Sequence, residues 1–238
     1  PDFTWIKCRT NTNQHYLFDS VRGAGRLLSS QNTDAQSGNP GNLLGSFNSN
    51  GFEVNRNYLS YTAYDNTNNT YPYVAWSWKA GGTASINTDG TLTSVVSANQ
   101  AAGFSIVSFS NNNSFTNTFG HGLGAQPELV IIKSTSIAAD WFVYVDSLGK
   151  SKRLQLNLYN AASSWSSNDG WNTTTGITSS VLSFAYSGTT YPFIAYCFKS
   201  ISGYSKVGSY TSNNTSLTIN VGFTPGLVLI KNIDTSGG

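Results

Sequence analysis

The chain contains internal repeats, and a chain that repeats itself folds into more than one copy of a similar unit. A proline followed by an apolar run and a lysine occurs three times, at residues 1–7, 127–133 and 225–231. A Tyr-Pro segment that also ends in lysine occurs twice, at 71–79 and 191–199. Short runs rich in β-branched and aromatic residues are typical of strands, so each of these segments predicts one.

Two further elements recur along the chain. Residues 16–20 match 143–147, and residues 103–109 match 203–210. An Asn-rich turn follows both members of the second pair. The interval between the glycines that open the second pair sets the length of one unit at about 100 residues.

The order of these elements predicts how the chain is divided. We expect a first copy that lacks its opening strands at 1–79 and a linker at 80–102, in which residues 91–96 are compatible with a short strand. A complete second copy follows at 103–200, and the opening strands of a third copy follow at 201–238. A sandwich without its opening strands exposes a sheet edge. Either upstream residues outside this chain cover that edge, or the hairpin at 203–222 of the same or a neighbouring chain does.

Composition favours an all-β fold. Only 10% of the residues are charged, and much of the polarity comes from Asn, Ser, Thr and Gly, which disfavour helices and favour turns between strands. Strand signals recur at short intervals, and no segment shows a convincing helical period. We therefore predict tandem antiparallel β-sandwich repeats, with a closed barrel as the alternative.

Charge and cysteine content exclude several classes of protein. The net charge is +2 and no basic cluster is present, so the sequence does not predict binding to nucleic acid. No apolar stretch is long enough to insert into a membrane. The two cysteines, Cys8 and Cys197, lie at non-equivalent positions, and we expect each to be a small buried apolar residue.

No catalytic or metal-binding motif stands out. The two histidines, His15 and His121, lie at non-equivalent positions without the partners that a triad or a metal site needs, so we expect neither an enzyme nor a cofactor. Asp19 and Asp146, each followed by serine, align between the copies; they either cap turns or bind a ligand, and turn capping is the favoured interpretation.

The recurring lysines have two interpretations. They close the apolar strands and the Tyr-Pro strands, at Lys7, Lys133, Lys231, Lys79 and Lys199. They either contact an anionic ligand or mark the points where strands reach solvent and discourage edge pairing, and the second interpretation is favoured.

The best ligand candidate is the loop from Trp165 to Trp171. Two tryptophans flank a polar segment that contains Asn168 and Asp169. Sugars bind on aromatic faces with amide and carboxylate groups beside them, so these four residues form a candidate glycan site. The alternative is that Trp171 is a core residue, like Phe52 at roughly the same place in the first copy.

Three stretches of the sequence resemble a known family. They are the long segment 78–107 (WKAGGTASINTDGTLTSVVSANQAAGFSIV), the segment 119–133 (FGHGLGAQPELVIIK) and Ala-Tyr-Cys-Phe at 195–198. They resemble a repeat in structural proteins of tailed bacteriophages, notably marine and cyanobacterial ones, that occurs in tail fibres and other virion appendages.

The resemblance implies a fold, a location and a role. It implies concanavalin-like jelly-roll repeats, a virion or extracellular location, and a non-catalytic structural role in host attachment. The implied partners are other copies of the chain or other virion proteins. A glycan-binding adhesin that contacts host surface glycans is the alternative function, and a glycan depolymerase is a third.

Overall fold

The computed structural model describes residues 1–10, 12, 14–38, 44–54, 72–111, 114–166, 169–174 and 176–235. Within these ranges the regular elements are β-strands, apart from one 3-10 turn, η1 (Asp146–Leu148). The paired strands of every sheet run antiparallel, and none of these sheets closes into a barrel. The predicted all-β antiparallel class is thus confirmed. In the described ranges no helix has the length and apolar character needed to cross a membrane.

The largest sheet has eight strands and is built mainly from the second copy. Its order is β14-β13-β12-β11-β18-β9-β8-β7. The strands are β14 (Ser163–Ser164), β13 (Lys152–Gln155), β12 (Phe142–Val145), β11 (Leu129–Ser134), β18 (Tyr191–Phe198), β9 (Phe104–Asn111), β8 (Ser94–Asn99) and β7 (Ser85–Asn87). The apolar strand β11 and the Tyr-Pro strand β18 therefore lie at the centre, where the apolar runs predict burial.

The first copy forms a smaller sheet with the same local order. This sheet is β3-β2-β1-β6, made of β3 (Leu28–Ser29), β2 (Tyr16–Asp19), β1 (Phe3–Cys8) and β6 (Tyr73–Trp78). Phe3 pairs with Trp78 as Leu129 pairs with Phe198, so β1–β6 and β11–β18 share one register. The sequence match between the copies is therefore also a match in strand pairing.

The correspondence between the two copies shifts by one residue at the strand that pairs with β1 or β11, which is β2 in the first copy and β12 in the second. Asp19 lies opposite Phe3, whereas Val145, not Asp146, lies opposite the equivalent Leu129. Successive side chains of a strand point to opposite faces, so a shift of one residue changes the face. Asp19 is accordingly buried and Asp146 is exposed, although the sequences align them.

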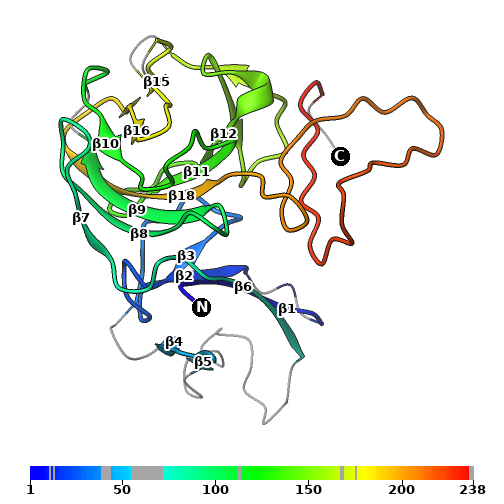
Figure 1. Ribbon diagram of the computed structural model, residues 1–238, viewed down its shortest axis with the longest axis horizontal. Coiled ribbons are helices and arrows are strands. Elements are labelled where there is room, and N and C mark those ends of the chain that lie inside the picture. The colour runs from blue at the N-terminus through cyan, green and yellow to red at the C-terminus, as the bar shows by residue number, and fades with distance from the viewer. Residues whose placement is uncertain are drawn as a thin grey trace.

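The two sheets pack face to face. Phe3, Leu17 and Leu28 of the small sheet share a core with second-copy residues that include Ile131, Val143, Ile194 and Tyr196. Figure 1 shows the small sheet lying below the curved large one. Because Phe3 and Leu129 are equivalent and both pack against this core, the two copies present the same face to each other.

Short strands cover the outer faces. On the large sheet these are the pairs β10 (Phe119–Gly120) with β16 (Val181–Leu182) and β15 (Gly170–Trp171) with β17 (Phe184–Ala185); on the small sheet it is the hairpin β4 (Leu44–Asn48) with β5 (Gly51–Val54). Phe52 and Trp171 each follow a glycine in these covering strands and pack on equivalent outer cores.

The segment expected to be a linker belongs to the large sheet. Residues 80–102 supply β7 and β8, and β8 pairs with β9 over five residue pairs. Val96 is buried there. Residues 94–99 read S-V-V-S-A-N, a run with strand character that the turn-rich segment before it obscures.

The segment expected to open a third copy forms no strand. Residues 203–235 consist of turns, bends and irregular chain, with a single bridge from Ser205 back to Ile201. Figure 1 shows this orange-to-red segment as a long loop beside the sheets. A strand needs a hydrogen-bonded neighbour, and in the described chain no sheet edge is joined to this segment.

Candidate functional site

The two tryptophans of the candidate glycan loop have different environments. Trp171 is 2% exposed and lies in the outer core of the large sheet, so a ligand cannot reach its ring. Trp165 is partly buried against the same core. Asp169 accepts hydrogen bonds from the Ser187 amide at 2.5 Å and the Ser166 hydroxyl at 2.8 Å. Asn168 lies outside the described residues.

The ring of Trp165 is closely surrounded. The Arg153 guanidinium lies 5.1 Å from its centroid, and the Phe142 and Phe184 rings lie 5.1 and 5.7 Å away. Gly170, at φ +113°, is so close that an added Cβ would lie 2.4 Å from the indole. These contacts hold the indole in place and restrict the ring surface available for stacking on a sugar.

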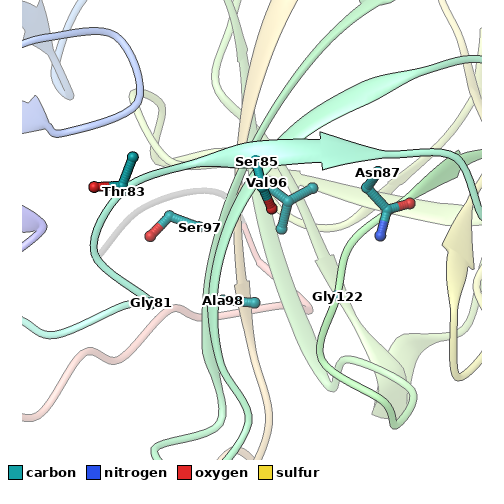
Figure 2. Close-up of a pocket in the computed structure, with 8 residues that line it drawn as sticks. All are labelled: Gly81, Thr83, Ser85, Asn87, Val96, Ser97, Ala98 and Gly122. Atoms are coloured by element: carbon teal, nitrogen blue, oxygen red, sulfur yellow. The ribbon is translucent and has the colours of Figure 1, made fainter.

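A pocket lies at the other end of the large sheet, on β7 and β8 (Figure 2). It has a volume of about 250 Å³ and is lined by Gly81, Thr83, Ser85, Asn87, Val96, Ser97, Ala98 and Gly122. Gly81 approaches β8 so closely that an added Cβ would lie 2.5 Å from the Ala98 carbonyl oxygen. The lining is neutral, with hydroxyl and amide groups beside two small apolar side chains, a combination that suits an uncharged hydroxylated ligand.

Neither histidine occupies a catalytic arrangement. His15 Nδ1 accepts a hydrogen bond from the Trp5 indole at 2.9 Å. His121 is fully buried; its Nδ1 accepts from the Leu123 amide, and its Nε2 lies 3.2 Å from the Thr178 carbonyl oxygen. With Nδ1 accepting, Nε2 carries the proton, so both ring nitrogens of a neutral imidazole are satisfied. In the described ranges no three His, Cys, Asp or Glu side chains cluster as metal ligands.

The buried His121 predicts acid sensitivity. Burial lowers the pKa of His121 from 6.5 to about 4. Between those values the unfolded chain binds a proton that the folded chain does not, so stability falls as the pH decreases. At about 1.4 kcal/mol per pKa unit, the loss approaches about 3 kcal/mol.

Urea unfolding of the wild type and His121→Gln at pH 7 and pH 4.5 measures this effect. Glutamine keeps an amide donor and a carbonyl acceptor but does not titrate, so the variant should lose less stability on acidification. Equal losses in the two proteins would show that other groups cause the acid sensitivity.

A buried ionic network joins the two copies. Arg22 Nε donates to Asp19 at 2.5 Å, and their side chains are 5% and 0% exposed. The Tyr196 hydroxyl, from the second copy, donates to Asp19 at 2.7 Å. The remaining guanidinium hydrogens reach the carbonyls of Leu17 and Arg26, the Gln36 side chain and the Tyr196 oxygen.

The guanidinium of Arg22 keeps its charge although its side chain is buried. Burial disfavours the charge on Arg22, but the Asp19 carboxylate and the Tyr196 hydroxyl outweigh burial, and the pKa of Arg22 is raised. Burial is also the main reason that the pKa of Tyr196 lies well above its usual value. Every donor of the guanidinium has a partner, which is the condition under which a buried ion pair is tolerated.

Residues after β3 also fasten the first copy to the second. Lys133 is fully buried, and its ammonium donates to the Thr33 carbonyl at 3.2 Å and to two carbonyls of its own copy. Burial lowers the pKa of Lys133 to about 8. The expectation that this lysine marks a strand end in solvent is therefore wrong, because the loop of the first copy covers it. The Trp141 indole donates to the Ser29 carbonyl at 2.8 Å in the same region.

Sequence reasoning missed this contact region because its partners are far apart in the chain. Asp19 and Tyr196 are separated by 177 positions, and Trp141 and Ser29 by 112. The one local signal was the spacing of Asp19 and Arg22, three residues apart after a strand. A carboxylate at a turn is ordinarily read as a cap, and Asp19 does accept the Arg22 amide at 2.8 Å.

These observations define an all-β protein made of antiparallel sheets that pack through a shared face. The family model described as a domain of unknown function (DUF7483) matches residues 1–238, and the chain belongs to this family. No curated protein and no solved structure matches the chain.

Proposed function

We propose that this chain is a non-catalytic structural module of a tailed-phage virion appendage, such as a tail fibre. In this proposal the two copies are tandem β-sandwich repeats of the concanavalin-like jelly-roll type, stacked in series for host attachment. The module is located in the virion or outside the cell, and its partners are further copies of itself or other virion proteins.

One observation carries the structural part of the proposal. The two copies contact each other through equivalent faces, and the buried Asp19, Arg22 and Lys133 all serve that contact. In some proteins, buried polar and ionic groups fix the register and orientation of packed elements. A module whose buried charges fix the geometry between repeats suits a stiff spacer that transmits position along an appendage.

The phage assignment rests on the resemblance of the segments around 78–107 and 119–133. An antibody raised against the purified chain should label an appendage of virions whose genome encodes it, as seen by immuno-electron microscopy. Labelling confined to infected cells, with bare virions, would refute the assignment. Release of oligosaccharides from host envelopes by the wild-type chain would favour a depolymerase instead.

The pocket in Figure 2 favours a second candidate, a glycan-binding adhesin. A neutral pocket of about 250 Å³ lined by hydroxyls suits one sugar unit. Ser85 is exposed on an edge strand that tolerates an aromatic residue, so Ser85→Phe fills the pocket without disturbing the core.

Glycan-array binding distinguishes the two candidate ligand sites. If the pocket binds glycan, Ser85→Phe should abolish the signals and Trp165→Ala should retain them. The reverse pattern would assign binding to the loop that contains Trp165 and Asp169. An array on which the wild type binds nothing would rule out the adhesin function.

A further inference from the structure

Arg153 is a fixed cation whose terminal nitrogens have no partner. It lies on β13, and its Nε donates a hydrogen bond to the Ser163 hydroxyl of β14 at 3.2 Å. The central carbon of its guanidinium lies 5.1 Å from the Trp165 ring centroid and 5.6 Å from that of Phe142. In the described chain its two terminal nitrogens form no hydrogen bond and no ion pair. Because Arg153 is partly exposed, these nitrogens are available to a ligand.

Arg22 shows how the same chain treats a guanidinium with a structural role. It is buried, and Asp19, Tyr196 and backbone carbonyls accept its hydrogen bonds. Arg153 instead has one hydroxyl partner and two aromatic neighbours. An arginine stacked on aromatic rings keeps the remaining donors of its plane for paired hydrogen bonds to an oxyanion. The surroundings of Arg153 therefore orient its guanidinium without neutralising it.

Two carboxylates lie in the same region but do not pair with Arg153. Burial, Asp169 and Asp140 raise the pKa of the Tyr186 hydroxyl and Arg153 lowers it, so all three charges act on this residue. Asp169 accepts hydrogen bonds from a serine amide and a serine hydroxyl, and Asp140 accepts from two side-chain amides. The local charge is therefore mixed, and an anion must be recognised by direct contact with the guanidinium rather than by a broad positive patch.

The environment of Trp165 favours an anionic group over an uncharged sugar ring. The guanidinium of Arg153 lies over the indole, so a sugar that stacks on this face must first displace a cation. The indole N–H is buried and has no acceptor among the described residues. Unpaired donors are thus in excess around this ring, and an oxyanion supplies acceptors without needing the aromatic face.

We propose that the Arg153 guanidinium binds the carboxylate or sulfate group of an acidic saccharide, beside Trp165. Its two terminal nitrogens match two oxygens of such a group. Asp169 and Asp140 each keep acceptor capacity beyond the two hydrogen bonds that they already accept, which suits the hydroxyls of the same sugar. This inference rests on the glycan-binding candidate described above, and it assigns acidic sugars to Arg153 and uncharged sugars to the pocket on β7 and β8.

A glycan array that carries uronate and sialate oligosaccharides beside their methyl esters, together with sulfated oligosaccharides, tests the proposal. Esterification removes the charge and keeps the sugar, so the wild-type chain should bind the acids and not the esters. Arg153→Gln should weaken binding of the acidic sugars at least about tenfold, because it removes hydrogen bonds to a charged group. The sulfated members show which of the two anionic groups is preferred. Equal binding of acids and esters would overturn the proposal.

Lys152→Gln is the matched control, because it removes the same charge from the preceding residue of β13. Lys152 is exposed, donates to the Ser164 hydroxyl at 3.1 Å, and points to the opposite face of the strand. Its loss should change the affinity by less than about twofold. Equal losses in Lys152→Gln and Arg153→Gln would indicate diffuse charge attraction and overturn the proposal.

Arg153→Lys separates the charge from the paired hydrogen bonds, and it keeps a cation in place if Arg153→Gln displaces Trp165, which near-UV circular dichroism would report. Lysine cannot form the two parallel hydrogen bonds of a guanidinium, so binding of acidic sugars should be weakened. Full affinity in Arg153→Lys would overturn the proposed contact.

Failure of this inference differs from failure of the glycan-binding candidate. If Ser85→Phe abolishes the binding of acidic and neutral sugars alike, and Arg153→Gln changes neither, the chain binds glycans through the pocket and the Arg153 site is refuted. An array without any signal for the wild type refutes both.

Discussion

Replacing Asp19 with alanine should lower the free energy of unfolding by about 3–5 kcal/mol, because it leaves a buried guanidinium without its carboxylate. Arg22 is 5% exposed and cannot recover the lost interaction by turning into water. The same change removes the acceptor of the Tyr196 hydroxyl at the contact between the copies. Urea unfolding, monitored by tryptophan fluorescence at pH 7, measures the loss.

Asp146→Ala is the matched control. This residue is aligned with Asp19 by sequence but is exposed, and it accepts hydrogen bonds from the Tyr144 hydroxyl and the Gln126 amide. Loss of these contacts should cost about 1 kcal/mol, the usual net value of a hydrogen bond. Similar losses in Asp19→Ala and Asp146→Ala would contradict the different burial of the two carboxylates.

Trp141→Ala should destabilise the chain by a similar amount, about 3–5 kcal/mol, through the cavity that it leaves. The Trp141 side chain is fully buried in the core shared by the two copies. Its indole also donates to the Ser29 carbonyl, so the substitution leaves that acceptor without this donor. Thermal and urea unfolding should both report the loss.

An exposed aromatic residue provides the comparison for this variant. Tyr159 is 72% exposed, and Tyr159→Ala should change stability by no more than about 0.5 kcal/mol. If Trp141→Ala were equally mild, the contact between the two copies would not contribute to folding as its burial indicates.

The central strands and their pairing could be predicted because the sequence repeats them. The segments 1–7 and 127–133 both carry a proline, an apolar run and a lysine, and they became β1 and β11 with one register against β6 and β18. An apolar run with a defined end fixes both the burial and the length of a strand. Similarity between copies therefore extends from sequence to pairing at these positions.

Other features could not be predicted, because they depend on contacts between distant segments. Lys133 was expected in solvent, but the Thr33 loop of the first copy covers it. Asp19 and Asp146 align in sequence, but a shift of one residue in pairing places them on different faces. Alignment alone does not fix which face a strand residue occupies.

The candidate ligand loop illustrates the same limit. An aromatic residue beside a polar loop has the same signature whether it binds a sugar or packs in a core. The glycine before Trp171 aligned it with Phe52 and so indicated a core position, which its 2% exposure matches. No sequence motif indicated the pocket on β7 and β8, because its lining combines strand residues with glycines from two separate loops.

If the two copies form one folding unit through their shared face, native-state hydrogen exchange should show it directly. The amides of β1 and β18 should exchange through the same global opening, with equal free energies. Asp19→Ala should then lower both free energies by the same amount. Exchange of the β1 amides at a much lower free energy, with Asp19→Ala affecting only the first copy, would contradict a shared fold.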